Sequence, residues 1–496
     1  MKIVNLSELF DLTFKGCSDR TALEFQSSSF TFRSLDARSN RWANELRKKR
    51  FEPGDRLAVY LPNCVPLIEI FLACVKTGVI FTPINVLYRA REISHILSDA
   101  EPRTLLTHRE MSAHVPDGTA PWLIEEAAAE VNRQAAEFAA LPLEGNAPTA
   151  LVYTSGTTGR SKGALLTHDN FAANATVLNT CWRMNSDDRM LLGLPLFHVH
   201  GLGNAVHTWL TTGYRVRLLE RFRKEAIFDE FLDFQPTVFF GVPTMYERLL
   251  AAPPDTARAI GSRMRLFVSG SAPLPAARLE RFRELYGHTI LERYGMSETL
   301  MNISNPYAGD RRPGSVGKPL PGISIRLVDP SAADATQEVG EGETGELLIK
   351  GANVFSGYWR QPEATRDAFT PDGYFRSGDL AVRSSDGYYT LQGRKTELIL
   401  CGGFNIYPRE IEEFLCEQPA VAEAAVVGIA DNVKGQVPIA YVVSAGEALD
   451  EESLRDCCRE HLASFKLPRK IIRVDDLPRN ALGKVQRHLL PTEEFG

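Results

Sequence analysis

The stretch Tyr153-Thr-Ser-Gly-Thr-Thr-Gly-Arg-Ser-Lys-Gly163 combines hydroxyl side chains, three glycines and two cations. Glycine lets the backbone approach an anion closely and adopt positive φ. Successive free backbone N–H groups form a concave site for phosphate oxygens, while Arg160 and Lys162 add positive charge. We interpret this stretch as a loop that grips a polyphosphate. It therefore predicts a protein that consumes a nucleoside triphosphate.

Three other interpretations of the loop are weaker. A Walker A loop needs a second glycine five residues after the first, and neither Gly156 nor Gly159 has one. The hydrolase pattern G-x-S-x-G fits around Ser161, but that motif places its serine directly between a strand and a helix. Here the predicted strand 150–153 ends well before the serine, and 164–167 is again extended in pattern. A solvated linker would rarely follow a buried strand and carry paired cations.

Length, charge and cysteine usage bound the class of protein. A chain of 496 residues exceeds a single core and predicts two or more domains. The net charge of −6 argues against a dedicated nucleic-acid binder. Eight cysteines without a C-x-x-C motif, and no apolar signal segment at the start, predict a reduced cytoplasmic protein. The richest apolar stretch, 65–84, is interrupted by Glu69 and Lys76, which favours a buried helix and strand over a membrane span.

Strands alternate with helices through the first three hundred residues. The pattern predicts a strand at 55–61, a helix at 67–76 and a strand at 78–83. Further short strands are predicted at 191–197, 237–241, 266–269 and 290–294, and a helix at 275–286 between Pro275 and Gly287. This alternation predicts an α/β fold of parallel-rich sheets flanked by helices, with ligand loops at the carboxyl ends of the strands.

The pattern of the sequence changes twice toward the carboxyl terminus. Short strands with frequent Gly and Pro predict a β-rich subdomain at about 309–394, which completes a large domain at 1–394. After a hinge at about 395–397, helices and strands alternate in a unit of roughly 100 residues. We expect this unit, 397–496, to be a small mobile α+β domain.

Several segments at strand ends carry candidate site residues. Glu298, in a turn after a strand, suits a magnesium ion that accompanies ATP; the alternative is a helix-N-terminal glutamate stabilised by the dipole. The run 269–273 leaves room for a flat ring with Tyr294 as a stacking face, or is a plain tight turn. His198 and His200 form an H-x-H pair without an apparent third metal ligand, which favours pocket lining over metal binding.

Three further polar side chains suit a nucleotide site. Asp379, after a tight turn, suits hydrogen bonds from ribose hydroxyls, and Arg394 suits the same sugar or a phosphate. Lys484 ends a loop in the small domain, as the cation of a closing lid would. Taken singly, each residue also has a purely structural interpretation: an Asp turn for Asp379, a surface arginine for Arg394 and a solvated lysine for Lys484.

The order of these segments resembles the acyl-adenylate-forming superfamily, which includes acyl-CoA synthetases, adenylation domains of peptide synthetases and firefly-type luciferases. The resemblance covers nearly the whole chain from about Phe30. It is carried by 154–163, 294–299, 377–379, 393–394, 402–403 with 407–412, and 478–484. It implies a two-step reaction in which a carboxylate attacks the α-phosphate of Mg-ATP, and a thiol, usually coenzyme A, then takes the acyl group from acyl-AMP.

The resemblance also implies roles for particular residues. Glu298 binds magnesium, Asp379 and Arg394 bind ribose, and Lys484 bridges carboxylate and phosphate. The β- and γ-phosphates fall to Thr154, Ser155, Gly156, Thr157, Thr158, Gly159 and Lys162, and the rest of the nucleotide to Ser271, Ala272, Pro273, Tyr294, Gly295 and Thr299. Rotation of the small domain brings Gly402 and Gly403 to the pantetheine tunnel. The catalytic residues implied are Lys484, Glu298, Thr154 and His198.

Two positions depart from the family pattern. Thr396 stands at the hinge, where Asp or Lys is common, and Lys434-Gly435-Gln436 stands where Gly-Glu is usual. We therefore expect the rotation of the small domain but no salt bridge specific to the hinge residue, because a hinge needs no particular residue type.

The acid is indicated by three segments, 194–202, 240–249 and 292–302, which look closest to malonyl-CoA and methylmalonyl-CoA synthetases. Arg248 lies where those enzymes keep a carboxylate-binding arginine, and a guanidinium suits a bidentate carboxylate; the alternative is a surface arginine. The other predicted acid-pocket residues are His198, Gly241, Ser269, Gly270 and Met301. A ligase for another short-chain, medium-chain or aryl acid stays open, as do a module that loads a separate carrier protein, a non-catalytic homologue, and a monomer or homodimer.

Overall fold

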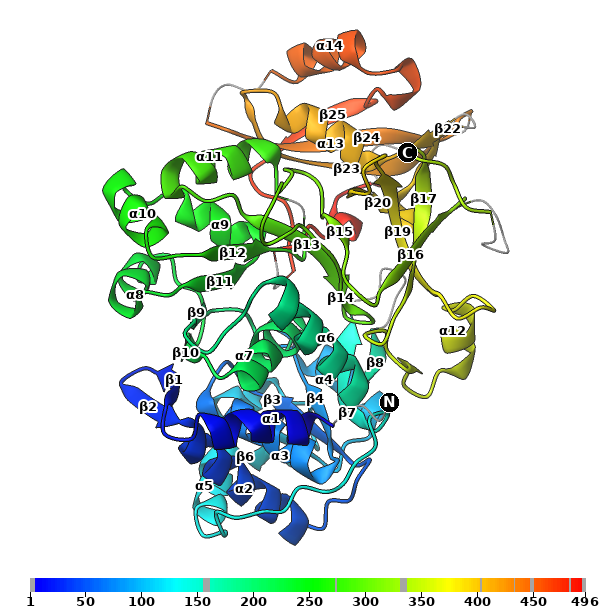
Figure 1. Ribbon diagram of the computed structural model, residues 1–496. Helices are drawn as coiled ribbons and strands as arrows, with labels where there is room; N and C mark the ends of the chain where they lie inside the picture. Colours follow the sequence, from blue (N-terminus) through cyan, green and yellow to red (C-terminus); the bar gives the residue numbers. More distant parts are fainter. Residues whose placement is uncertain are drawn as a thin grey trace.

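The computed structural model describes residues 5–154, 161–272, 274–330, 337–401, 404–431, 433–446, 450–480 and 483–492. The strands of two large parallel-rich sheets lie between Thr21 and Tyr358, and Figure 1 shows the C-terminal strands and helices above them. The observed mixture of parallel sheets and flanking helices confirms the predicted α/β class.

The first sheet has the order β15-β14-β13-β12-β11-β9-β10-β1-β2. Its central pairs, from β13 to β1, are parallel, and its edges are antiparallel. Its strands are β1 (Thr21–Phe25), β2 (Ser28–Thr31), β9 (Arg189–Leu192), β10 (Arg215–Leu218), β11 (Val238–Gly241), β12 (Leu266–Ser269), β13 (Leu291–Met296), β14 (Leu300–Ser304) and β15 (Lys318–Pro319).

The second sheet has the order β18-β8-β7-β4-β3-β5-β6, with β7, β4, β3, β5 and β6 parallel and β8 antiparallel to β7. Its strands are β3 (Arg56–Tyr60), β4 (Ile80–Pro83), β5 (Thr104–Thr107), β6 (Trp122–Leu123), β7 (Pro148–Thr154), β8 (Lys162–Thr167) and β18 (Gly357–Tyr358). Ser161 is therefore followed by a strand, so the serine-elbow interpretation fails on geometry.

Helices cover the faces of both sheets. They are α1 (Leu6–Gly16), α2 (Phe32–Lys48), α3 (Val65–Thr77), α4 (Ala90–Ala100), α5 (Ile124–Val131), α6 (His168–Cys181), α7 (His207–Thr212), α8 (Ile227–Phe234), α9 (Pro243–Leu249), α10 (Pro254–Gly261) and α11 (Ala276–Tyr286). Two short helical segments are the 3₁₀ segment η1 (Arg109–His114) and the π-helical η2 (His200–Val206).

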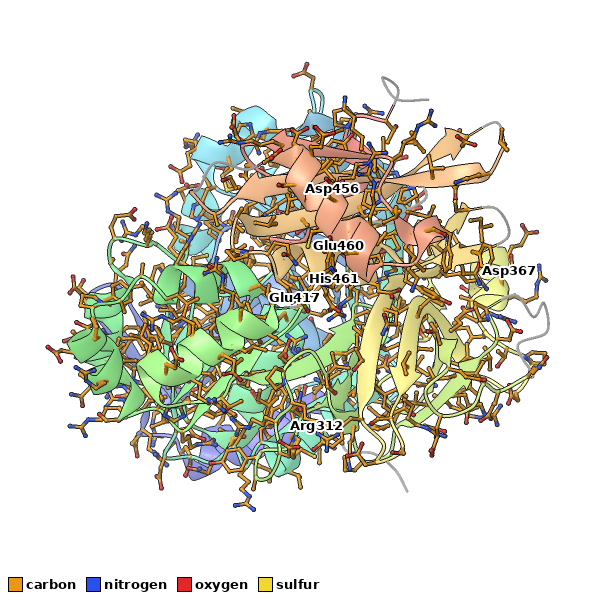
Figure 2. The ribbon with its side chains drawn as sticks, turned by 90° about the horizontal axis from the view of Figure 1, so that it is seen from above. Arg312, Asp367, Glu417, Asp456, Glu460 and His461 are labelled. Atoms are coloured by element: carbon orange, nitrogen blue, oxygen red, sulfur yellow. The ribbon has the colours of Figure 1, made fainter. Side chains whose placement is uncertain are left out.

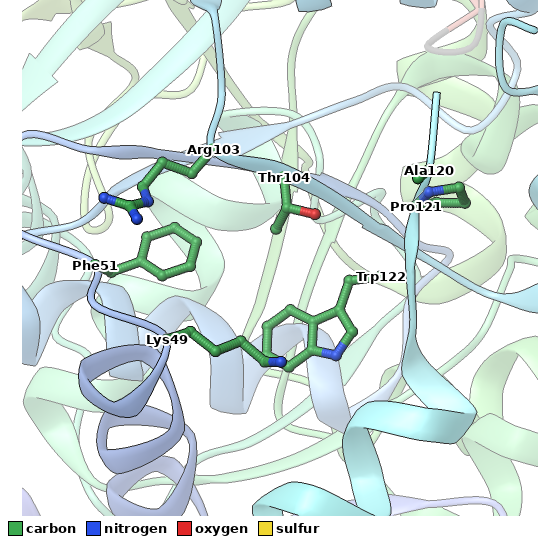
Figure 3. A pocket seen from close by; sticks show the side chains of 7 residues that line it. All are labelled: Lys49, Phe51, Arg103, Thr104, Ala120, Pro121 and Trp122. Carbon is green, nitrogen blue, oxygen red and sulfur yellow. The ribbon is translucent and has the colours of Figure 1, made fainter. Parts of the chain in front are cut away.

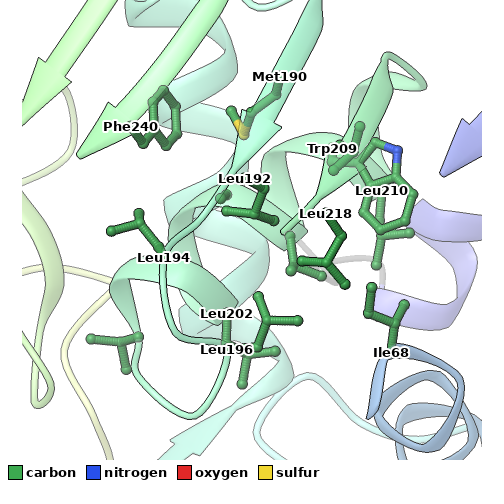
Figure 4. Close-up of a cluster of buried hydrophobic side chains, with 14 of the residues drawn as sticks. Ile68, Met190, Leu192, Leu194, Leu196, Leu202, Trp209, Leu210, Leu218 and Phe240 are labelled. Atoms are coloured by element: carbon green, nitrogen blue, oxygen red, sulfur yellow. The ribbon is translucent and has the colours of Figure 1, made fainter. Parts of the chain in front are cut away.

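Helix α3 is apolar on nearly every side and is buried along nearly its whole length, as expected of a helix that lies inside the core. Ile68 on α3 joins the same buried cluster as Leu192 of β9 and Trp209 of α7 (Figure 4). One core thus joins the two large sheets. Within the described ranges, no helix is long and apolar enough to cross a membrane.

The β-rich segment forms an antiparallel sheet of order β16-β17-β19-β20 with its own apolar cluster. Its strands are β16 (Ser324–Val328), β17 (Thr344–Lys350), β19 (Phe375–Arg383) and β20 (Tyr389–Arg394), with α12 (Pro362–Asp367) beside them. Asp379 and Arg394 are Cα partners across β19 and β20. This register brings two predicted site residues face to face.

The C-terminal segment has a separate core. A 3₁₀ turn, η3 (Lys395–Glu397), leads into β21 (Ile399–Cys401), β22 (Phe404–Ile406), α13 (Pro408–Cys416), β23 (Val421–Asp431), β24 (Gly435–Ser444), α14 (Glu451–His461), η4 (Ser464–Lys466), β25 (Lys470–Val474) and η5 (Arg487–Leu489). Seen from above, this unit lies over the large domain, with Asp456, Glu460 and His461 on the outward helix α14 (Figure 2). The domain boundaries stay predictions.

Candidate active site

The predicted phosphate loop joins two paired strands. β7 ends at Thr154 and β8 begins at Lys162, and these two residues are Cα partners. The Thr154 Oγ1 hydroxyl donates to the Lys162 carbonyl at 3.4 Å. Several predicted site residues lie outside the described residues, namely Ser155, Gly156, Thr157, Thr158, Gly159, Pro273, Gly402 and Gly403.

Glu298 is a buried carboxylate in the turn between β13 and β14. That turn joins two strands, so the alternative of a helix-N-terminal glutamate is wrong. The Tyr358 hydroxyl donates to Glu298 Oε1 at 3.1 Å, and the Phe355 N–H donates to the Glu298 carbonyl at 2.7 Å. Burial raises the pKa of Glu298, and Arg394 and the Tyr358 hydroxyl oppose that rise. Lys162 Nζ lies 5.0 Å from the centre of the Tyr358 ring, so an acid and a cation share one tyrosine.

A second polar group forms around Asp379. Arg394 Nε lies 2.7 Å from Asp379 Oδ1, and the Tyr294 hydroxyl donates to Asp379 Oδ2 at 2.5 Å. The Asp379 N–H donates to Ser377 Oγ at 3.0 Å, which fixes the turn. The carboxylate of Asp379 raises the pKa of Arg394. The predicted ribose residues and the predicted stacking tyrosine therefore form one hydrogen-bonded group.

Lys484 of the C-terminal domain lies within electrostatic range of this group. Its N–H donates to Asn480 Oδ1 at 3.0 Å. Burial lowers the pKa of Lys484, the like charge of Arg394 lowers it further, and Asp379 opposes the change. Beside it, Gly483 packs against Thr244 of α9, where an added methyl group would collide. The structure thus places the predicted lid lysine next to the predicted ribose site.

Small and polar residues gather at the carboxyl ends of β11, β12 and β13. Ser269 ends β12, and Gly270 and Ser271 follow it. Gly270 lies so close to the Arg293 guanidinium that a methyl group there would collide with it. The Ser271 hydroxyl lies 3.3 Å from His200 Nδ1. The other residues predicted for this region are Gly241, at the end of β11, the half-buried Ala272, Gly295, Thr299 and the buried Met301.

Arg293 is a buried cation without a partner for part of its guanidinium. Neither its Nε nor its Nη2 has a hydrogen-bond partner among the described residues. Burial lowers the pKa of Arg293, and its charge in turn lowers the pKa of His198 and His200, which burial already depresses, that of His198 to about 4. In the same described set, His200 Nε2 and Ser269 Oγ are also unpaired. A buried unpaired charge is costly, so this group suits an anionic ligand.

Arg248 lies elsewhere. It is exposed on α9, its Nη1 donates to the Phe222 carbonyl at 3.4 Å, and its guanidinium lies over the Phe222 ring. This placement favours the alternative of a surface arginine. Sequence reasoning overlooked Arg293 and Tyr358 as site residues. Arg293 lies inside the quoted segment 292–302, but nothing in the letters marks it as buried and unpaired.

A surface hollow on the second sheet lies away from these residues. It is lined by Lys49, Phe51, Arg103, Thr104, Ala120, Pro121 and Trp122 (Figure 3). It lies at the amino end of β5, whereas Thr154 lies at the carboxyl end of β7, another strand of the parallel part of the same sheet. Its cations already have partners, because Lys49 pairs with Glu130 at 3.1 Å and Arg103 with Asp55 at 3.0 Å. The hollow is therefore not part of the candidate active site.

The chain is similar to known proteins over nearly its whole length. A malonate–CoA ligase of Arabidopsis thaliana is 31% identical over 97% of this chain and 88% of its own length. A feruloyl-CoA synthase of an Amycolatopsis species is 35% identical over 94% of both chains. The crystal structure of ATP-bound MatB from Rhodopseudomonas palustris superposes with a TM-score of 0.91, at 38% identity and 99% coverage of both chains.

The family match itself spans most of the chain. Residues 10–359 match the AMP-binding enzyme family, and residues 410–484 match the AMP-binding enzyme C-terminal domain. The chain belongs to the AMP-binding enzyme family.

Proposed function

We propose that the chain is an ATP-dependent acid–CoA ligase whose acid is malonate or methylmalonate. In the first step a carboxylate oxygen attacks the α-phosphorus of ATP, the bond to the bridging oxygen breaks, and pyrophosphate leaves. In the second step the sulfur of coenzyme A attacks the acyl carbon of acyl-AMP, the thiol proton is lost, and AMP leaves. The AMP-binding match and the similarity to an ATP-bound enzyme support the nucleotide and the reaction class.

The chain's own residues account for the charge that moves in the first step. Negative charge accumulates on phosphate oxygens, and preorganised cations and donors stabilise it. We assign Lys162 to the leaving phosphates, Asp379 with Arg394 to the ribose, and Lys484 to the oxygens between acid and α-phosphate. Thr154 adds a hydroxyl at the strand end. His198, with its pKa lowered to about 4, supplies a neutral ring beside the acid.

A divalent cation fits the site. Magnesium is held by one or two carboxylates together with substrate phosphates. Glu298 supplies one buried hard oxygen group, and the described residues contain no cluster of three or more acidic, histidine or cysteine ligands that would hold an ion alone. Glu298 would hold the magnesium, which would neutralise phosphate charge.

The choice of acid rests on Arg293. Its guanidinium lies against Gly270, with Nε and Nη2 unpaired among the described residues, and His200 Nε2 and Ser269 Oγ nearby in the chain's fold are unpaired as well. A monocarboxylic acid would spend its only carboxylate on the adenylation reaction and leave this cation buried and unpaired. A dicarboxylate would bring a second carboxylate to it, and a guanidinium binds that group strongly. The Arabidopsis relative named a malonate–CoA ligase agrees with this assignment.

The test is pyrophosphate release and CoA-thioester formation over a panel of malonate, methylmalonate, butyrate, benzoate and ferulate. We expect malonate or methylmalonate to give the highest kcat/KM. Arg293→Met should lower kcat/KM for malonate about 100-fold, because it removes the partner of a buried carboxylate, and should leave the KM for ATP nearly unchanged.

Arg248→Met is the matched control, because it removes an arginine from the surface of α9. We expect it to change malonate turnover less than threefold, as surface substitutions usually do. The dicarboxylate assignment fails if malonate is no better than butyrate, and a loss confined to Arg248→Met would return the carboxylate to Arg248. A ligase for ferulate or another aryl acid, as the Amycolatopsis relative is named, would then be favoured. Thioester formed only on a carrier protein, and not on free CoA, would identify an acyl-loading module.

A further inference from the structure

Tyr358 contacts both charged groups that the proposed reaction places on the triphosphate. Its hydroxyl donates to Glu298 Oε1 at 3.1 Å, and its ring centre lies 5.0 Å from Lys162 Nζ. A hydrogen bond to an ionised carboxylate is stronger than a neutral one. An ammonium group over an aromatic face is attracted by the ring quadrupole. One side chain therefore interacts with an anion and a cation through different parts of itself.

The tyrosine is itself held in place. β18 pairs with β8, so that Tyr358 is the Cα partner of Ala164, two residues after Lys162. The Tyr358 N–H donates to Thr365 Oγ1 at 2.9 Å, and the Phe355 ring packs edge-on against the phenol at 4.9 Å. The backbone of the lysine strand and the backbone of the tyrosine strand are thus tied together.

The Glu298 turn is tied to the same segment. The Phe355 N–H donates to the Glu298 carbonyl at 2.7 Å. The Asn353 side-chain amide donates to the carbonyls of Thr299 and Met301. Asn353 is buried, and the Asn170 amide on α6 donates to the carbonyls on either side of it. The segment 353–358 therefore braces the acidic turn through its backbone and its side chains.

We propose that Tyr358 is a positioning residue that holds the Glu298 carboxylate and the Lys162 ammonium group where they meet metal-bound triphosphate. This inference rests on the proposed function for the presence of ATP, but not on the identity of the acid. Without the phenol, the carboxylate would be free to rotate inside a buried turn. Without the ring, the Lys162 ammonium group would lose the aromatic face over which it lies.

The experiment measures ATP binding by the full chain without any acid, so that no turnover occurs. Isothermal titration calorimetry gives the ATP dissociation constant over a series of Mg²⁺ concentrations and in EDTA, and electron paramagnetic resonance of Mn²⁺ reports the metal directly. Tyr358→Phe keeps the ring and loses the hydroxyl. We expect it to raise the Mg²⁺ concentration for half-maximal ATP affinity about tenfold and to leave affinity in EDTA unchanged. Tyr358→Leu should also weaken binding in EDTA, about threefold.

A double-mutant cycle separates positioning from general damage. In a Glu298→Gln background, Tyr358→Phe should add no further loss, because the two residues act through one contact. Tyr388→Phe is the matched control. The Tyr388 hydroxyl donates to the Asp310 carbonyl at 2.7 Å and contacts neither Glu298 nor Lys162 among the described contacts. This variant should leave both affinities unchanged.

The result that overturns the inference is an unchanged Mg²⁺ requirement in Tyr358→Phe, an equal loss with and without metal, or the same loss in Tyr388→Phe. If no acid on the panel reacts but the Mg²⁺ shift is observed, the role of Tyr358 stands and only the acid assignment fails. If the unaltered chain binds no ATP, both proposals fail.

Discussion

Glu292 is a buried carboxyl group one residue before Arg293, with 7% of its surface exposed. Its Oε2 accepts a hydrogen bond from the Gly314 N–H at 3.1 Å. Burial raises the pKa of Glu292 to about 7, although Gly314 and Arg409 oppose the rise. The folded protein therefore holds a proton here over a range in which the unfolded chain, with the ordinary value of 4.5, has lost it.

This difference predicts a pH dependence of stability. The contribution of Glu292 is favourable below about pH 4.5 and is lost as the pH rises through about 7, because only the folded state still binds the proton in that window. Glu292→Gln keeps an acceptor for Gly314 and removes the charge. We expect the variant to gain about 1–3 kcal/mol in the free energy of unfolding at pH 8 and nothing at pH 4.5.

Urea unfolding at a series of pH values measures this gain. Glu280→Gln, on the exposed face of α11, is the control and should show no such trend. A constant difference between Glu292→Gln and the unaltered chain at all pH values would contradict the assignment.

At the scale of elements, local sequence patterns predicted the helices and strands whose first and last residues are marked by the residue types at their ends. Helix α11 follows Pro275, and its C-cap Gly287 has a φ of 74°, as the Pro and Gly at its ends predict. β8 was expected as an extended segment and is one. These elements are specified by residues within or next to them.

The strand predicted at 191–197 was wrong at both ends, because β9 spans Arg189–Leu192. The apolar residues beyond it lie in a buried loop. The Asn63 side chain satisfies that loop by donating to the Leu194 carbonyl at 2.9 Å and accepting from the Leu196 N–H at 2.9 Å. Local periodicity cannot reveal a partner more than 130 residues away. The unpaired state of Arg293 is invisible for the same reason.

The contact between Gly483 and α9 gives a prediction for the lid. Gly483 has a φ of 75°, and a methyl group there would meet Thr244 of the large domain. We expect Gly483→Ala to slow acyl-AMP formation about 30-fold, because strain and collision each cost on the order of 1 kcal/mol. Thioester formation from supplied acyl-AMP should slow less. Pyrophosphate release and thioester assays measure the two steps separately.

Gly446→Ala is the matched control, because its φ of 104° carries similar strain while no described atom lies within 4 Å of the added methyl group. It should leave both steps nearly unchanged. Adding Thr244→Ala should restore part of the loss in Gly483→Ala. If Gly446→Ala slows adenylation as much as Gly483→Ala does, backbone strain alone would explain the effect.

At the scale of the whole molecule, the C-terminal core is distinct from the cores below it. Its buried members lie between Ile399 and Leu490, and they form a cluster separate from those of the large domain. A segment with its own core is expected to fold alone. The two family matches divide the chain in the same region, since the first match ends at residue 359 and the second begins at residue 410.

We expect the fragment 398–496 to fold by itself. We expect the fragment 1–394 to bind ATP without forming acyl-AMP, because this fragment lacks Lys484. Circular dichroism melting of the small fragment and calorimetric ATP titration of the large one test these outcomes. A small fragment without a cooperative transition would show that its core depends on the large domain.

Lys484 and Arg394 carry like charges: burial lowers the pKa of Lys484, and the charge of Arg394 lowers it further. Under the proposed function, phosphate between them would remove that repulsion, so that bound nucleotide and a closed C-terminal domain would stabilise each other, as thermodynamic linkage requires. The affinity of the lid for the site should therefore depend on how much negative charge remains there. When pyrophosphate leaves, part of that charge leaves with it, and the balance shifts toward opening. The two cations would thus favour opening of the C-terminal domain after adenylation and before the attack of coenzyme A.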